Sequence, residues 1–204
     1  MDMQDRRVRR TQKSLARALI ALTLEKGYEA ITIRDITDRA EVGYATFFRH
    51  YHDKNALLQD VLDVVLDELT GLLQSPMSDT NHILTGTLIF HYVQEHSEVV
   101  HVLLSSRGSA SMLRRIIEAG TQSVFIQNTP LPDSLIPPEI AAYHLIASTI
   151  SLIQWWVERE MPYTPETMGV IYQELIARPT QAAAFNHLIE EAISPSIPAK
   201  DQSV

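Results

Sequence analysis

The sequence predicts an all-α fold in two parts, an N-terminal three-helix head and a C-terminal helical body. Apolar residues recur at three- and four-residue spacing from Thr11 to Leu22 and again from Leu57 to Leu73, which is the periodicity of helices with one buried face. No segment alternates between apolar and polar residues for long enough to indicate a strand. Prolines cluster at 130–138 and at 162–165 and mark breaks between helices.

The composition is that of a soluble globular chain. Of 204 residues, 45% are apolar, and no window approaches eighteen uninterrupted apolar residues. The first ten residues are rich in arginine, with no apolar stretch behind them to make a secretion signal. The chain has no cysteine, which removes disulfides, thiolate zinc sites and thiol nucleophiles and fits a reducing compartment. We therefore expect a cytoplasmic protein.

The charge is divided unevenly along the chain. The net charge is −8, yet residues 1–54 hold eleven Lys or Arg against eight Asp or Glu, and residues 55–204 hold six against seventeen. The head is therefore +3 and the remainder −11. A basic end on an acidic body allows one face to approach phosphates while the rest is repelled. Chance asymmetry is the alternative explanation of the charge alone.

The first elements are an arm and a helix. Residues 1–10 are expected to form a flexible basic arm, whose arginines could contact DNA or could be solvated. A helix is predicted from Thr11, with Gly27 ending it as a left-handed cap.

The stretch from Ile31 to Lys54 predicts a helix-turn-helix. Thr32 and Asp35 are spaced as a short-armed capping box, and the helix that they open has one apolar face. Gly43 stands where the next helix must begin, and no breaker follows before Tyr51. Two helices joined by so short a turn cannot pack antiparallel, so they cross steeply. Such a unit reads DNA.

A longer helix at 53–75, capped by Asp53, is predicted to bridge the DNA-binding domain, residues 11–54, to a body spanning 76–194. Residues 195–204 are expected to be a frayed tail. Further helices are predicted at 80–95, 97–105, 109–127, 138–160, 165–177 and 180–193.

These signals, in this order, resemble the tetracycline-repressor (TetR) family of ligand-controlled transcriptional repressors. Over residues 11–62 the resemblance is carried by Gly27-Tyr28, the Thr32 to Asp35 cap, Ala40, Val42, Thr46-Phe47-Phe48, His50-Tyr51 and Asp53-Lys54. In the body, Leu103 to Gly108 and Ile153 to Val157 resemble a recurring C-terminal type of this family, in which two long helices pair with their copies in a second subunit. Three positions depart from the family pattern: Glu41 where Gly is frequent, Gly43 where Ser is common, and Tyr44 where a smaller or basic residue is usual.

The resemblance implies a homodimer that binds a palindromic operator and is released when a small-molecule effector binds in the body. The bridging helix would then transmit the effect of ligand binding from the body to the DNA-binding domain. The alternative is a regulator of the same fold that binds DNA or protein without an effector. We find no motif of an enzyme, such as a nucleophile elbow, a phosphate-binding glycine loop or a zinc-protease helix, and no cofactor is implied.

The recognition helix places Tyr44, Ala45 and Thr46 against base edges, and Phe47 in the core. The predicted phosphate contacts position the protein on the duplex. The full set of expected DNA-binding residues is Thr32, Arg34, Tyr44, Ala45, Thr46, Phe48, His50, Tyr51 and Lys54. His50 could instead be a plain surface residue, and Tyr51 a half-buried ring at the helix junction.

The segment from Ile140 to Val157 is nearly all apolar, and a helix apolar on nearly every side must be buried on nearly every side. We prefer burial against 165–177 and a second copy over burial within a monomer. The predicted dimer residues are Ala142, Ile146, Ile150, Ile153, Val157, Ile171 and Leu175.

The remaining helices could enclose a cavity suited to a drug-sized apolar or cationic molecule. Its predicted lining is Phe90, His91, Leu104, Met112, Ile116, Phe125, Tyr143 and Trp155, each of which could also be ordinary core. His91 and Glu95 could share a helix face, but His96 lies off that face and no cysteine helps. We therefore do not predict a metal site.

Overall fold

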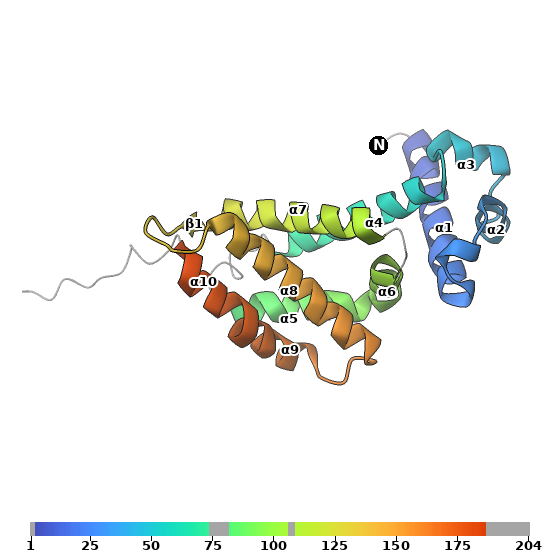
Figure 1. Cartoon of the computed structure of the whole chain (residues 1–204). Helices are drawn as coiled ribbons and strands as arrows, with labels where there is room; N and C mark the ends of the chain where they lie inside the picture. The colour runs from blue at the N-terminus through green and yellow to red at the C-terminus, as the bar shows by residue number, and fades with distance from the viewer. Residues whose placement is uncertain (1–2, 74–81, 106–108, 187–204) are drawn as a thin grey trace, which may run out of the picture.

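The computed structural model describes residues 3–73, 82–105 and 109–186. Its helices form a small head and a longer body (Figure 1), and one helix, α4, runs from the first into the second. The head and this bridging helix consist of α1 (Met3–Lys26), the 3₁₀ turn η1 (Tyr28–Ala30), α2 (Ile33–Arg39), α3 (Tyr44–His50) and α4 (Lys54–Leu73). The all-α fold predicted from the sequence is confirmed.

The head folds around one core, which also includes Tyr92, Val102 and Leu103 of the body. Leu19 of α1, Ile36 of α2, Phe47 of α3 and Leu57 of α4 are each fully buried in it. Each of these residues is the inward position of its own helical stripe, so burying one core fixes the mutual placement of four helices. The core extends along α4 to Val65, and this continuity ties α4 to the head.

Two expectations at α1 need correction. Residues 3–10 are not an arm but the first turns of α1, which begins at Met3. This stretch has no glycine or proline and is rich in arginine, a good helix former, so the helix continues upstream of Thr11. At the other end, Gly27 has φ 79° and ψ 146°. It has the positive φ that glycine tolerates, but its ψ is extended rather than left-handed.

The body is built around a second core. Its elements are α5 (His82–Glu95), α6 (Ser97–Ser105), α7 (Ser109–Gln127), α8 (Pro138–Glu158), α9 (Pro165–Tyr172), the π-helical turn η2 (Gln173–Ala177) and α10 (Arg178–Ala184). Phe90 of α5, Trp156 of α8 and Met168 of α9 are fully buried together. Leu69 and Leu73 of α4 pack against them, so α4 contributes to both cores.

The last helices differ from the prediction of two separate helices at 165–177 and 180–193. In the structure, α9 passes through η2 into α10 without a break. Pro179 lies in the first turn of α10. The preceding π-helical turn is wider than an α-helix, and this irregularity accommodates a proline that a regular helix interior excludes. The helix ends at Ala184, and residues 187–193 lie outside the described part of the chain, as does the predicted tail.

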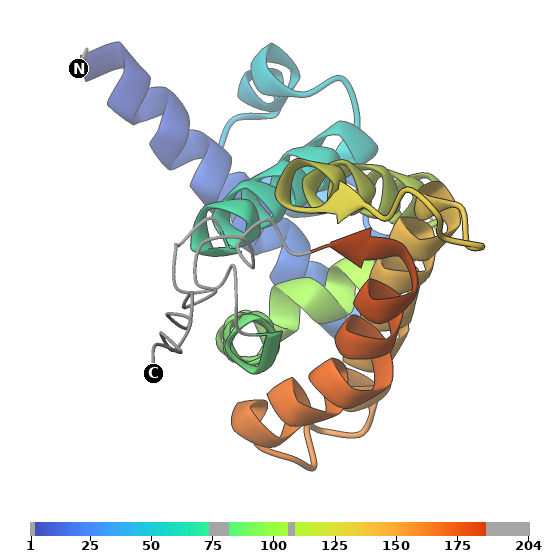
Figure 2. The same ribbon diagram turned by 90° about the vertical axis from the view of Figure 1, so that its left-hand side faces the viewer.

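A short pairing closes the end of the body. The two-residue strands β1 (Thr129–Pro130) and β2 (Phe185–Asn186) are antiparallel, and Figure 2 shows β2 lying beside β1 directly after α10. The sequence did not predict these strands, because two residues are too few to show alternation. The pairing holds the connection between α7 and α8 against the end of α10.

Within the described ranges, α8 is the one helix long and apolar enough to cross a membrane by length and composition, but only 28% of its most apolar stretch is buried. It packs on α7 and α10. Its Ile140, Tyr143 and Trp155 are 60%, 55% and 40% exposed. The helix therefore carries large apolar side chains that the described part of the chain leaves exposed.

Candidate DNA-binding surface and ligand groove

The start of α2 is a complete capping box, as predicted. The Thr32 amide donates to Asp35 Oδ2 at 2.8 Å, and the Asp35 amide donates to Thr32 Oγ1 at 3.1 Å. Hydrogen bonds from the Thr32 hydroxyl and amide, together with Lys26 Nζ at 3.0 Å, hold the pKa of the Asp35 carboxyl well below its usual range. The box fixes the direction in which α2 enters the motif.

The turn between α2 and α3 has left-handed backbone geometry. Glu41 has φ 55°, and the Val42 amide donates to the Thr37 carbonyl at 2.9 Å. A non-glycine residue in this region costs about 1–2 kcal/mol. Glu41, which stands where the family frequently has Gly, therefore carries a small backbone strain at a position that suits glycine. Gly43 follows as the N-cap of α3 with no side-chain cap.

The α3 helix has one buried and one open face. Phe47 is fully buried, whereas Tyr44 and Phe48 are 55% and 47% exposed. Their two rings pack edge to face with centroids 5.2 Å apart. Ala45 is exposed and Thr46 half-buried. The predicted base-reading residues therefore lie at the start of a helix whose outer face is free to enter a groove of DNA.

Other predicted phosphate contacts surround α3. Thr32 and Arg34 are exposed and His50 is half-buried. One exposed cation was missed, Arg49, which lies four residues after Ala45 and so shares its face of the helix. That spacing was a usable signal. The DNA contacts of all these residues stay a prediction.

Two predicted phosphate ligands have other partners. The Tyr51 ring is buried, and its hydroxyl donates to Asp60 Oδ2 at 2.5 Å. Burial and this carboxylate raise the pKa of Tyr51 far above its usual value. A hydroxyl that donates to Asp60 has no proton left for a phosphate, which only accepts. We therefore correct the assignment of Tyr51, which follows the alternative of a buried ring.

Lys54 likewise faces the protein. Its Nζ donates to the carbonyls of Tyr28, Ile31 and Glu29 at 2.9, 3.0 and 3.4 Å. It also lies 4.5 Å from the centroid of the Tyr28 ring. An ammonium has three N–H donors, and all three are engaged here. Lys54 therefore ties the segment before α2 to the start of α4, which corrects our assignment of this side chain to a phosphate.

Acidic residues of α4 bridge to three other elements. Asp60 accepts from Tyr51 just after α3. One turn later, Asp63 pairs with Arg115 of α7 at 2.5 Å, and Glu68 accepts from Tyr92 of α5 at 2.8 Å. The helix thus carries polar contacts to the DNA-binding motif and to the body on successive turns, a direct mechanical connection between them.

The predicted pocket residues do not share one cavity. Phe90 packs in the second core against the ring of Trp156, and Leu104 lies beside it. Ile116 packs on the head core, and His91 pairs with Glu166 at 2.9 Å. These residues are corrected to core and surface-pair roles. The prediction failed because helical periodicity indicates which residues are buried but not what they are buried against.

The other four behave differently. The Trp155 ring is stacked on Tyr163 with centroids 6.3 Å apart at the far end of α8. The side chain of Met112 lies outside the described residues. Phe125 and Tyr143 do line a common groove, so two of the eight predicted residues meet in one site.

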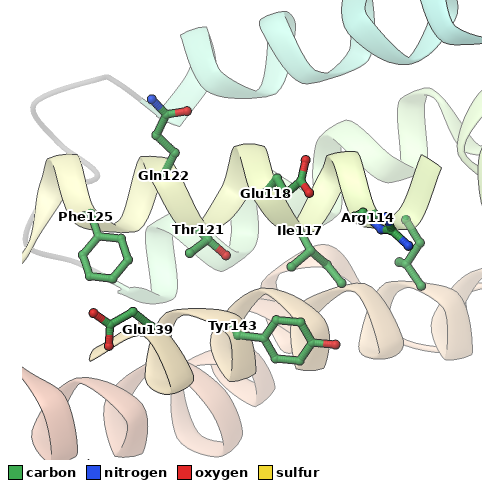
Figure 3. Close-up of a pocket in the computed structure, with 9 residues that line it drawn as sticks. Arg114, Ile117, Glu118, Thr121, Gln122, Phe125, Glu139 and Tyr143 are labelled. Atoms are coloured by element: carbon green, nitrogen blue, oxygen red, sulfur yellow. The ribbon is translucent and has the colours of Figure 1, made fainter. Parts of the chain in front are cut away.

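That groove lies between α7 and α8 and has a volume of about 810 Å³ (Figure 3). Its lining residues are Leu113, Arg114, Ile117, Glu118, Thr121, Gln122, Phe125, Glu139 and Tyr143. The α7 residues Leu113, Ile117, Thr121 and Phe125 recur every four positions. This stripe was the sequence signal that we missed. The groove is the candidate ligand site of the body.

Several predicted dimer residues pack within the chain itself. Ala142 and Ile146 belong to a small third cluster with Phe185, whereas Ile153, Val157 and Ile171 pack on the second core. Ala142 is fully buried, but the other four, like Ile150, are only partly buried, so their part in a dimer contact stays a prediction. Leu175, in contrast, is 68% exposed. Among residues 3–73, 82–105 and 109–186, no group of three or more His, Asp or Glu residues is placed to hold a metal.

A helix-turn-helix with an open recognition helix, joined to a helical body by one bridging helix, defines a DNA-binding transcriptional regulator. The family described as bacterial regulatory proteins, tetR family, matches residues 15–61, and the family described as transcriptional regulator C-terminal region matches residues 85–178. The chain belongs to the TetR family of transcriptional regulators.

Relatives agree with this placement. The HTH-type transcriptional regulator YxbF of Bacillus subtilis is 27% identical over 170 residues, which are 81% of this chain and 44% of that protein. The chain thus spans about half the length of the curated relatives that it matches first.

Two solved structures share the fold along most of the chain. A TetR-family regulator of Syntrophomonas wolfei has a TM-score of 0.66 at 18% identity, covering 83% of this chain and 94% of that one. A complex of SmeT with triclosan has a TM-score of 0.61 at 15% identity, covering 95% and 99%.

Proposed function

We propose that this regulator is a homodimeric repressor, which binds a two-fold symmetric operator through α3 and is released when a small molecule binds in the body. The observation that carries the proposal is the division of α3. Phe47 anchors the helix in the core, and Tyr44, Ala45 and Phe48 are left exposed. Hydration of an exposed pair of aromatic rings is unfavourable, and contact with a partner surface removes this cost.

A second copy is supported by the exposed apolar side chains of α8. One recognition helix contacts few bases, so helix-turn-helix proteins of this kind bind as dimers to half-sites about one helical turn apart. Ile140 and Leu175 are 60% and 68% exposed. Covering both in a symmetric contact would place two heads on one side of the dimer.

Control by a small molecule is supported by the groove between α7 and α8 and by the bridges from α4. A structural neighbour is named as a complex with triclosan, so this fold can hold a small organic molecule. A ligand that favours a different separation of the two heads weakens operator binding. By thermodynamic linkage, the operator weakens ligand binding by the same factor.

The test begins with selection of bound fragments from random DNA by the purified full chain, followed by sequencing. We expect one palindromic motif, bound by a dimer. Tyr44→Ala should change the preferred bases, and Tyr163→Ala, which alters a similarly exposed tyrosine between α8 and α9, should leave the motif unchanged. Selection of no motif, or an identical motif with Tyr44→Ala, would contradict the assignment of α3.

A screen for small molecules that release the protein from the selected DNA distinguishes the two functions that the sequence left open, a regulator with an effector and a regulator without one. Release by any compound supports effector control. Undisturbed binding across the screen, with a normal motif, would favour a regulator of this fold without an effector.

A further inference from the structure

We infer that the groove between α7 and α8 binds an organic cation with an elongated apolar body, and that its charged head lies at the end formed by Phe125 and Glu139. This inference deepens the proposed function by naming the class of effector. It rests on that function only for the consequence of binding, because the binding itself requires no DNA.

The apolar part of the site comes from one face of α7. In Figure 3 the side chains of Ile117 and Phe125 point from α7 toward α8, where the Tyr143 ring faces them. From Arg114 to Phe125 the helix rises by about 16 Å. A groove of this length, lined by aliphatic and aromatic side chains, is suited to an extended chain or to linked rings rather than to a compact polar metabolite.

The charges that face the groove favour a cation at one end. The lining holds the Arg114 guanidinium at one end and the Glu139 carboxylate at the other, whereas the Glu118 carboxylate points away from α8. Glu139 has no ion-pair partner within the described ranges. It stands beside Phe125 in Figure 3, so a cation placed there meets a carboxylate next to an aromatic ring.

Arg114 fixes the direction of the occupant. It lies at the opposite end of the groove from Phe125, three turns along α7 (Figure 3), and a cationic head is repelled from it. Its aliphatic stem can cover the apolar end of the ligand while the guanidinium stays in water. The head is therefore directed to the Glu139 end.

Thr121 adds an unused hydrogen-bonding group in the wall between the two ends. Its Oγ1 is buried and has no hydrogen-bond partner in the described structure. A helical threonine commonly satisfies its hydroxyl on the carbonyl four residues earlier, as Thr149 does on Leu145 at 2.7 Å. The exception at Thr121 leaves an unsatisfied hydroxyl in the wall of the groove.

The test is titration calorimetry of the purified full chain with two amphiphiles of equal chain length, decylammonium and decanoate. We expect decylammonium to bind about ten-fold or more tightly than decanoate. Glu139→Gln should weaken decylammonium binding about ten-fold, and Phe125→Leu should weaken it by a smaller factor. Circular dichroism of each variant checks that it is folded.

The chain offers a matched control in Glu118→Gln. Glu118 also lines the groove, but its carboxylate points away from α8 in Figure 3. This variant removes the same charge from the same groove, and it should keep decylammonium affinity within about two-fold. Equal binding of the two amphiphiles, equal losses with Glu118→Gln and Glu139→Gln, or no loss with Glu139→Gln would each overturn the inference.

The cation site and the proposed function can each fail without the other, and the measurements distinguish the two failures. Absence of decylammonium binding by a protein that still selects an operator would refute the cation site and leave DNA binding intact. Decylammonium binding that depends on Glu139 but leaves operator affinity unchanged would support the site and contradict its control of DNA.

Discussion

Gly86 of α5 and Gly169 of α9 meet where these two helices cross, so closely that a methyl group on Gly86 would lie 2.9 Å from the Gly169 α-carbon. A methyl group on Gly169 would meet the Ile83 carbonyl oxygen at 2.8 Å. Both obstacles are backbone, which cannot rotate away. The crossing therefore requires glycine on both helices, and it sets the spacing of the helices beside the second core.

Gly169→Ala is expected to destabilise the fold. Overpacking of a tight core costs about 1–3 kcal/mol, and in a chain of this size each kcal/mol lowers Tm by about 2–4 °C. Thermal unfolding followed by circular dichroism measures the shift. The control is Gly71→Ala in α4, where nothing lies within 4 Å of the added methyl group. It should gain up to about 1 kcal/mol from helix propensity. Equal stability of the two variants would contradict the close crossing.

Arg34→Ala and Lys54→Ala should separate a phosphate contact from a structural tether. Arg34 is exposed, so its loss should leave Tm nearly unchanged. It should lower the slope of log affinity against log salt by about one. Lys54→Ala removes three hydrogen bonds to backbone carbonyls, so it should lower stability by about 1–2 kcal/mol without changing the slope. Operator binding measured at several salt concentrations distinguishes the two effects. A slope lowered by Lys54→Ala would restore Lys54 to the phosphate contacts.

Leu175→Glu should convert a dimer into a monomer. Leu175 is 68% exposed, and a buried, unpaired carboxylate on the proposed contact is strongly unfavourable. Light scattering after size-exclusion chromatography measures the mass. Leu135→Glu is the control, because Leu135 is 100% exposed in the connection before α8 and is not one of the residues on which the proposed contact rests. It should remain dimeric. A dimer in both variants would place the interface elsewhere.

Arg115→Gln should uncouple the groove from the head. The pair with Asp63 is about half-exposed, so its loss should change stability by no more than about 1 kcal/mol. It should reduce the ratio of operator affinities without and with decylammonium, because the ion pair between α7 and α4 is lost. Arg178→Gln, which breaks a similarly exposed pair with Glu174 inside the last helical segment, should leave the ratio unchanged. Equal ratios in the wild type and both variants would exclude the Asp63 contact as the coupling.

The head was largely predictable from the sequence because its signals are local. The capping box at Thr32 spans four residues, and Asp53 caps α4 through the Ala56 amide at 2.8 Å, as expected. The helices of the body were also predicted closely up to α8, since prolines and helical periodicity act within a few residues. The continuous passage from α9 into α10 was missed because a π-helical turn has no sequence signature comparable to a cap.

What the sequence by itself determined is which segments are helical, which of their faces are apolar, and to which family the chain belongs. The tertiary structure decided what those faces meet. Tyr51 and Lys54 carry the polar groups of phosphate ligands, but their partners at Asp60 and at the Tyr28 to Ile31 backbone come from other elements. The same holds for α8. A helix apolar on nearly all sides has no periodic contrast to show which side turns outward, and only its packing against α7 and α10 leaves Ile140 exposed and forms the groove.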